Sequence, residues 1–285
     1  MRLHRVFVLL LVVLAIAPAV RAHPSAAHRI ELLTREIEAS PDDPMLYLRR
    51  GQAYSNEGML DRALADLRRA ESLGDPALVA YEVGVALYRR GDLPGARAAF
   101  DRFLERFPQH PPALEYRARV ARDAGDAASA LADFEAYFAL QEDPNPGDYL
   151  SAARLVQDIE GGGAEAALRV LDRGMAKLGV IPQLQQPAIA IERARGRPAA
   201  AIARLETLAP QMGGSPDWKV EMGELLLASG RVEEARARLG EAGAQLEGLR
   251  VTAARRTLAE RVESLLAASL RGRSDVDRRG SEDAP

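Results

Sequence analysis

Residues able to carry out chemistry are few in this chain. It contains no cysteine, which excludes disulfides, thiol catalysis and zinc or iron–sulfur centres held by cysteine. Of its 4 histidines, only His23, His28 and His110 lie beyond an apolar segment at the N-terminus. Catalysis or metal binding by histidine would have to use nearly all of them. We therefore expect a protein that is not an enzyme and carries no cofactor.

One histidine arrangement has a defined chemistry. If a leader were removed after Ala22, His23 would become the first residue, and its free amine and imidazole together can bind copper. Such a site needs a second histidine supplied by the fold, whereas His28 lies in the same short segment. A linker after the leader explains His23 better, so a copper-binding or hydrolytic enzyme stays only a third hypothesis.

Two further patterns resemble reactive motifs but lack a required part. Gly161–Gly163 is not followed by the Lys-Ser/Thr of a phosphate-binding loop, and we expect a turn between helices there. The acidic pairs Asp42/Asp43 and Glu233/Glu234 lie where helices are predicted to begin, and negative charge is favourable at a helix N-terminus. We interpret them as helix caps and solvated faces.

The chain is organised by an internal repeat of glycine and alanine. Six glycines, spaced 33, 34, 37, 34 and 34 residues apart, are each followed five residues later by alanine: Gly58/Ala63, Gly91/Ala96, Gly125/Ala130, Gly162/Ala167, Gly196/Ala201 and Gly230/Ala235. A large apolar residue follows each alanine by four positions: Leu67, Phe100, Phe134, Leu171, Leu205 and Leu239. A period near 34 predicts a helix-turn-helix solenoid, with glycine in the turn and alanine where two helices approach closely.

This pattern resembles the tetratricopeptide repeat family. The first unit carries Leu48-Arg-Arg-Gly51-Gln-Ala53-Tyr54 with Gly58, Ala63, Leu67 and Ala70, and the second matches at Val83, Gly84, Ala86, Gly91, Ala96, Phe100 and Pro108. Residues 44–144 form three well-matched units and residues 145–248 three weaker ones. The resemblance implies an all-α fold, a helix-turn-helix solenoid of about six repeats with a capping helix at each end.

Prolines and apolar spacing set the remaining boundaries. Most prolines fall between the units or in the first turn of a helix, but Pro187 falls inside an expected helix, which we predict to be shortened or to begin at Gln186. Residues 23–43 should hold the N-terminal capping helix, 249–271 the C-terminal one, and 272–285 a disordered tail. Proline and glycine in the 37-residue interval predict a break in the solenoid at 141–148 or 161–163.

The N-terminus has the order of a secretory leader. Arg2 and Arg5 precede the apolar run Val6–Ala17, which is too short to span a membrane, and small residues follow up to Ala22. We expect residues 1–22 to be removed, leaving a periplasmic or secreted protein whose formal net charge falls from −3 to −6. A retained leader would instead tether the chain to the membrane.

The family resemblance also implies where a partner would bind, because the first helix of each repeat lines a concave groove. The implied groove residues are Gln52, Asn56, Tyr81, Val85, Tyr88, Arg89, Arg119 and Arg122. Tyrosine and arginine are common at interfaces, and the two arginines on one face of the third unit predict a basic rim and an acidic partner. A structural role is the alternative: Glu115 and Arg119 would pair four residues apart, and the tyrosines would pack between neighbouring helices.

Three functions follow in order of preference. The first is a non-catalytic periplasmic scaffold or adaptor that binds another protein through a peptide or helix. The second is a membrane-tethered structural subunit of an envelope complex, and the third is the copper or hydrolytic enzyme. Nucleic acid is not an expected partner, because 38 basic and 41 acidic residues give no broad positive field.

Overall fold

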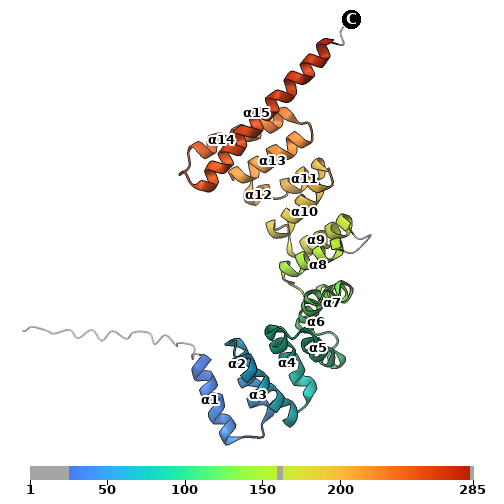
Figure 1. Cartoon of the computed structure of the whole chain (residues 1–285), viewed down its shortest axis with the longest axis vertical. Helices are drawn as coiled ribbons and strands as arrows, with labels where there is room; N and C mark the ends of the chain where they lie inside the picture. Colours follow the sequence, from blue (N-terminus) through green and yellow to red (C-terminus); the bar gives the residue numbers. More distant parts are fainter. Residues whose placement is uncertain (1–25, 159–162, 283–285) are drawn as a thin grey trace, which may run out of the picture. The chain divides into compact units, whose positions relative to one another are not determined.

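The computed structural model describes residues 26–158 and 163–282, with side chains for 26–157 and 163–270. Within these ranges all regular secondary structure is helical (Figure 1). The helices are α1 Ala26–Ala39, α2 Pro44–Asn56, α3 Leu60–Leu73, α4 Pro76–Arg90, α5 Leu93–Arg106, α6 Pro111–Asp123, α7 Ala127–Leu140, α8 Pro146–Asp158, α9 Gly163–Leu178, α10 Pro182–Ala194, α11 Pro198–Glu206, α12 Ala209–Met212, α13 Pro216–Ala228, α14 Val232–Glu247 and α15 Ala253–Glu282. The predicted all-α solenoid is confirmed.

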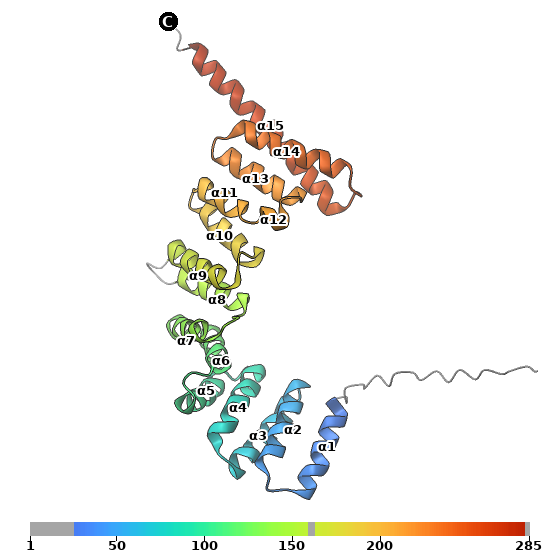
Figure 2. The same ribbon diagram turned by 180° about the vertical axis from the view of Figure 1, so that it is seen from behind.

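The chain divides into two compact units, one ending at Ala86 and one beginning at Leu87, so that the division falls within α4. In unit 1, α1, α2 and α3 lie side by side, and in unit 2 the helices from α6 to α15 follow as neighbouring pairs (Figures 1 and 2). The break that we expected at 141–148 is not seen: Phe138 of α7 stacks on Tyr149 of α8 with ring centroids 3.9 Å apart. The backbone N–H of Asn145 also donates to the Tyr137 hydroxyl at 3.2 Å.

Prolines and polar caps begin the helices where the sequence predicts. Seven helices start at proline, whose missing N–H has no partner in the first turn anyway: Pro44, Pro76, Pro111, Pro146, Pro182, Pro198 and Pro216. Side chains accept from free backbone N–H groups at several starts, as when Asp126 accepts from Ser129 at 3.1 Å. Hydrogen bonds from Ser129 and from the Arg97 guanidinium lower the pKa of Asp126 to about 2.

The repeat positions form the core, as the sequence predicts. All six motif alanines and all six large apolar residues that follow them are 0% exposed. Five of the six predicted turn glycines have positive φ, as at Gly91 with φ 84°, while Gly162 lies outside the described residues. Close approach is also needed at Gly223, where an added Cβ would lie 2.7 Å from Leu239 Cγ. Glycine and alanine thus set the separation of the two helices in a repeat.

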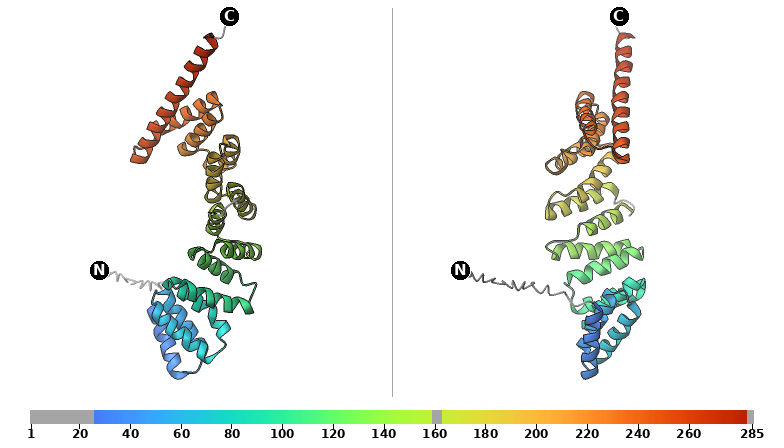
Figure 3. Two further views of the ribbon diagram at one scale, coloured as in Figure 1. Left: turned by 45° about the vertical axis from the view of Figure 1, so that its right-hand side comes forward. Right: turned by 90° about the vertical axis from the view of Figure 1, so that its left-hand side faces the viewer.

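Two predicted boundaries are wrong. Helix α10 runs through Pro187 from Pro182, because only one backbone hydrogen bond is lost when proline lies so near a helix start. Helix α15 begins at Ala253 and continues beyond residue 271 to Glu282, into the segment for which we expected disorder (Figure 3). No proline interrupts the sequence between Pro216 and Pro285, so no residue there forces the helix to end. The short helix α12 is an addition that the repeat pattern does not predict.

Candidate partner-binding surfaces

In unit 1, two of the predicted groove residues line a pocket. Gln52 and Asn56 of α2 lie in a hollow of about 520 Å³ that α1 and α4 also border. Gln52 Nε2 donates to Glu82 Oε1 at 2.8 Å, so its amide is fixed in position. Tyr81 is half-buried, but Val85 is only 8% exposed and belongs to the core. The prediction that Val85 faces a partner is therefore wrong.

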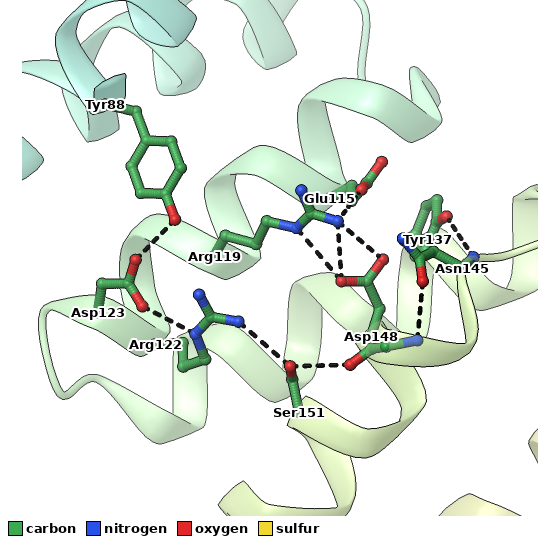
Figure 4. Close-up of polar contacts among 10 residues, drawn as sticks. Tyr88, Glu115, Arg119, Arg122, Asp123, Tyr137, Asn145, Asp148 and Ser151 are labelled. Carbon is green, nitrogen blue, oxygen red and sulfur yellow. Dashed lines mark hydrogen bonds and ion pairs between the residues drawn. The ribbon is translucent and has the colours of Figure 1, made fainter. Parts of the chain in front are cut away.

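In unit 2, Arg119 of α6 lies at the centre of a polar network between α6 and α8 (Figure 4). Its guanidinium donates to Asp148 of α8 at 3.1 Å and forms an ion pair with Glu115 one turn earlier on α6. The Asp148 side chain is only 3% exposed. Arg119 therefore joins two neighbouring repeats, in addition to the pair with Glu115 that its spacing predicts.

Burial governs protonation in this network. Desolvation raises the pKa of Glu115, and the nearby Asp148 carboxylate raises it further, although Arg119 acts in the opposite direction. Desolvation likewise raises the pKa of Asp148 despite its hydrogen bonds from Arg119. One guanidinium therefore serves two carboxyl groups that both resist ionisation more than an exposed carboxyl does.

A second chain of hydrogen bonds begins at Tyr88, in the last turn of α4 (Figure 4). The Tyr88 hydroxyl donates to Asp123 Oδ2 at 2.6 Å, and Arg122 Nε donates to Asp123 Oδ1 at 2.8 Å. Arg122 also donates to the Ser151 hydroxyl of α8 at 3.2 Å. Although burial opposes it, these bonds from Arg122 and Tyr88 hold the pKa of Asp123 below its usual value. Burial and the bond to Asp123 raise the pKa of Tyr88.

These contacts change the interpretation of the groove residues predicted on α4 and α6. The structure brings Tyr88, Arg119 and Arg122 together, and Arg89 is exposed nearby on α4. The two arginines do not form a basic rim, since three carboxylates, those of Glu115, Asp123 and Asp148, pair with them. The Tyr88 ring also packs edge-on against Tyr116 at 6.0 Å. The structural alternative, pairing and packing between neighbouring first helices, is the arrangement found for these side chains.

A different groove in unit 2 is open and apolar. We define the α8–α10 groove as a hollow of about 420 Å³ lined by Leu150, Ala153, Arg154, Gln157, Ala164, Leu171, Pro187, Ala190, Ile191, Ala194 and Arg195. Its described lining residues include two arginines and no carboxylate. Arg195 pairs with Glu165 at 2.6 Å, whereas the exposed Arg154 has no ionic partner among the residues whose side chains are described. The groove thus combines an apolar floor with a cation that has no ionic partner among the described side chains.

Sequence reasoning missed this groove because groove residues were assigned only in the three well-matched units, residues 44–144. The groove lies among the weaker units, where α8 starts at Pro146. Counting from Pro146, the fifth, ninth and twelfth positions, which face the groove in this family, are Leu150, Arg154 and Gln157. The ninth position counted from Pro182, the first residue of α10, is Ala190. The same count, applied to α8 and α10, would have identified these residues.

The histidines have local roles. His110 caps α6 by accepting from the Ala113 N–H at 3.2 Å, and burial lowers its pKa. His28 lies 4.0 Å from Glu31 on α1, while His23 falls outside the described residues. No cluster of three or more potential metal ligands occurs among residues whose positions are described.

In the same part of the chain, no helix has the length and apolar character needed to cross a membrane. The predicted leader falls outside it.

Comparison with known proteins agrees with this architecture. Two models of the tetratricopeptide repeat match residues 81–145 and 192–261. No curated protein matches the chain in sequence. Similar solved structures include the C-terminal part of a TPR repeat-containing protein from Cytophaga hutchinsonii, with a TM-score of 0.61 and 16% identity over 79% of this chain and 95% of that one.

Two further solved structures share the fold. A tetratricopeptide repeat protein from Parabacteroides merdae has a TM-score of 0.50 and 18% identity over 86% of this chain and 92% of its own. YrrB, described as a TPR protein with an unusual peptide-binding site, has a TM-score of 0.53 and 17% identity over 65% of this chain and 94% of its own. The two matched repeat models, at residues 81–145 and 192–261, identify the chain as a tetratricopeptide repeat protein, and these solved structures share its fold.

Proposed function

We propose that this tetratricopeptide repeat protein is an exported, non-catalytic scaffold that binds a peptide segment of another protein in the α8–α10 groove. The observation that carries the proposal is the composition of that groove, an apolar floor bordered by arginine with no carboxylate among the lining residues that the structure describes. The fold is that of a protein–protein interaction scaffold. Export is inferred from Arg2, Arg5 and the apolar run Val6–Ala17.

The groove chemistry defines the partner that fits best. Ala153, Ala190 and Ala194 leave room for an apolar side chain, and burying it supplies most of the affinity. Arg154 offers its guanidinium to a carboxylate, either an acidic side chain or a free C-terminus. The partner peptide should therefore place an apolar residue beside a carboxylate. The Arg119 guanidinium already pairs with Glu115 and Asp148 of this chain. It therefore supports the groove and does not contact the peptide.

A display library of random peptides tests the proposal. Peptides selected by the wild-type protein should share an apolar residue next to an acidic group. Arg154→Glu, which reverses the groove charge, and Ala190→Arg, which fills its floor, should each weaken a selected peptide about tenfold or more. Arg169→Glu is the matched control, because Arg169 is exposed on α9 outside the groove lining.

The outcomes separate the possible sites. Equal binding by wild type, Arg154→Glu and Ala190→Arg would contradict the assignment. If only the replacement of Gln52 and Asn56 weakened binding, the site would move to unit 1. Unchanged circular dichroism of each variant is required, so that loss of binding reports the groove and not the fold.

A further inference from the structure

The two ends of this solenoid are complementary halves of a repeat. Each unit consists of a first helix followed by a second, but among the described residues α1 stands alone before the first helix α2, and α15 stands alone after the second helix α14. Helix α1 takes the place of a second helix. In the pair α5 and α6, Asp101 of the second helix α5 accepts a hydrogen bond from Arg117, 16 residues later on the next first helix. Thr34 of α1 accepts one from Arg50 of α2 with the same spacing of 16 residues. Helix α15 takes the place of a first helix, with Val262 packed against α13 and α14.

At the C-terminal end, the position of the missing second helix is hollow. A cavity of about 520 Å³ lies between α14 and α15, over Gly240 and Gly243. Gly240 and Gly243 lie five and eight residues after the motif alanine of α14, and the residues at these positions of α7 are Glu135 and Phe138. Both contact the next repeat: Glu135 accepts a hydrogen bond from Arg173, and Phe138 stacks on Tyr149. This side of α14 is therefore the one that receives a following repeat, and glycine leaves it unfilled.

At the N-terminal end, the position of the missing first helix is hollow as well. The pocket of about 520 Å³ in unit 1 lies over one face of α1, formed by Arg29, Leu32 and Glu36, and over α2. Leu32 is 41% exposed, although a leucine on a packing face of a helix is normally covered. The two ends thus each have an uncovered packing face of similar size.

We propose that α15 of one copy of this chain pairs with α1 of a second copy, so that the two lone helices complete one repeat and join the chains head to tail. The charges favour this occupant over an unrelated helix. In an antiparallel pair, like those inside each repeat, Arg255 comes opposite Glu36 and Glu263 comes opposite Arg29, while Ala259 lies beside Leu32. The charged residues are eight positions apart on α15 and seven on α1, which is about two helical turns in both.

The four charged groups are available for this pairing. Arg29, Glu36 and Glu263 are exposed and form no ion pair with any residue whose side chain is described. The Arg255 guanidinium donates to the backbone carbonyl of Arg250 at 2.8 Å and forms no ion pair with a described side chain. Because the two joined surfaces are different, each added copy leaves one end free, and association continues with concentration.

Charge exchange at the joint is the test. Sedimentation velocity of the wild-type protein should show species larger than the monomer that increase with concentration. Arg29→Glu places like charges at the joint, and so does Glu263→Arg, so each variant alone should remain a monomer. The double variant Arg29→Glu/Glu263→Arg restores opposite charges and should assemble again.

A mixture of the two single variants makes the test specific for head-to-tail order. Arg29 of the Glu263→Arg variant can meet Glu263 of the Arg29→Glu variant, and the two free ends of that complex again carry opposite charges. An equimolar mixture should therefore assemble beyond the dimer with the two variants alternating, although each variant alone stays a monomer. A wild type that stays monomeric at the highest attainable concentration would overturn the proposal, and so would single variants that assemble like the wild type. Circular dichroism and the unfolding midpoint verify that each variant is folded.

Discussion

At the scale of single residues, Arg119 illustrates how pairing changes the role of a charge. Its position predicts a basic rim facing an acidic partner, yet Glu115 and Asp148 both bind its guanidinium. Because charges in a partly buried setting attract strongly, such a pair positions two helices and leaves little field for a ligand. Arg154, one repeat later, has no such ionic partner among the described side chains and is the arginine that suits ligand binding.

Tyr88→Phe tests whether the Tyr88 hydroxyl stabilises the fold. The variant keeps the ring contact with Tyr116 but removes the 2.6 Å hydrogen bond to Asp123. Since Arg122 still satisfies Asp123, the free energy of unfolding should fall by only about 0.5 to 1.5 kcal/mol, as measured by urea denaturation. Tyr54→Phe serves as control, because no hydrogen bond of the Tyr54 hydroxyl is found among the described residues. An equal loss in both variants would contradict a specific role for Tyr88.

Glu115→Gln tests the protonation of the Arg119 network. Because its folded pKa is raised by burial, Glu115 binds a proton more tightly in the folded than in the unfolded protein. Its contribution to stability is therefore largest below its ordinary pKa and decreases as the pH rises through the interval up to the raised value. The stability of wild type relative to Glu115→Gln should fall over that interval, as measured by denaturation at a series of pH values. A difference that is constant or grows with pH would contradict the assignment.

At the scale of helices, small residues decide how closely a pair packs. Gly223→Ala would bring a Cβ to 2.7 Å from Leu239 Cγ, so α13 and α14 must separate or Leu239 must move. Overpacking of this kind costs about 1 to 3 kcal/mol. Gly240→Ala on α14 is the matched change, since no atom lies within 4 Å of its added Cβ, and it should stabilise the helix by about 0.5 to 1 kcal/mol. Thermal unfolding midpoints that shift in the same direction for both variants would contradict this packing account.

The sequence predicts the helices well, because each repeat contains residues that mark where its helices begin, turn and pack. Glycine in the turn, proline at the helix start and alanine at the closest contact are local requirements, and all can be read without knowledge of the fold. The end of α15 is not predicted, because charged residues are compatible with both an exposed helix and a disordered tail. The candidate groove is not predicted either, because residues 145–248 match the family pattern less well and groove residues were therefore assigned only in residues 44–144.

At the scale of the whole molecule, we propose that the ends of the chain determine its location and its assembly. A leader that is removed after Ala22 would leave three residues before α1, so the N-terminal packing face would lie almost at the mature terminus. Intact-mass analysis of the protein from its own host should therefore give a species that begins at His23. A membrane-bound species that retains residues 1–22 would instead favour the tethered structural subunit.

The central claim is that a peptide of another protein binds in the α8–α10 groove. Hydrogen exchange of the full chain, measured with and without a peptide selected from the display library, tests it most directly, because a bound peptide slows exchange in the helices that it contacts. We predict added protection in residues 146–158 and 182–194, with little change in residues 44–123. Protection confined to residues 44–123, or none in α8 and α10 at saturating peptide, would contradict the assignment.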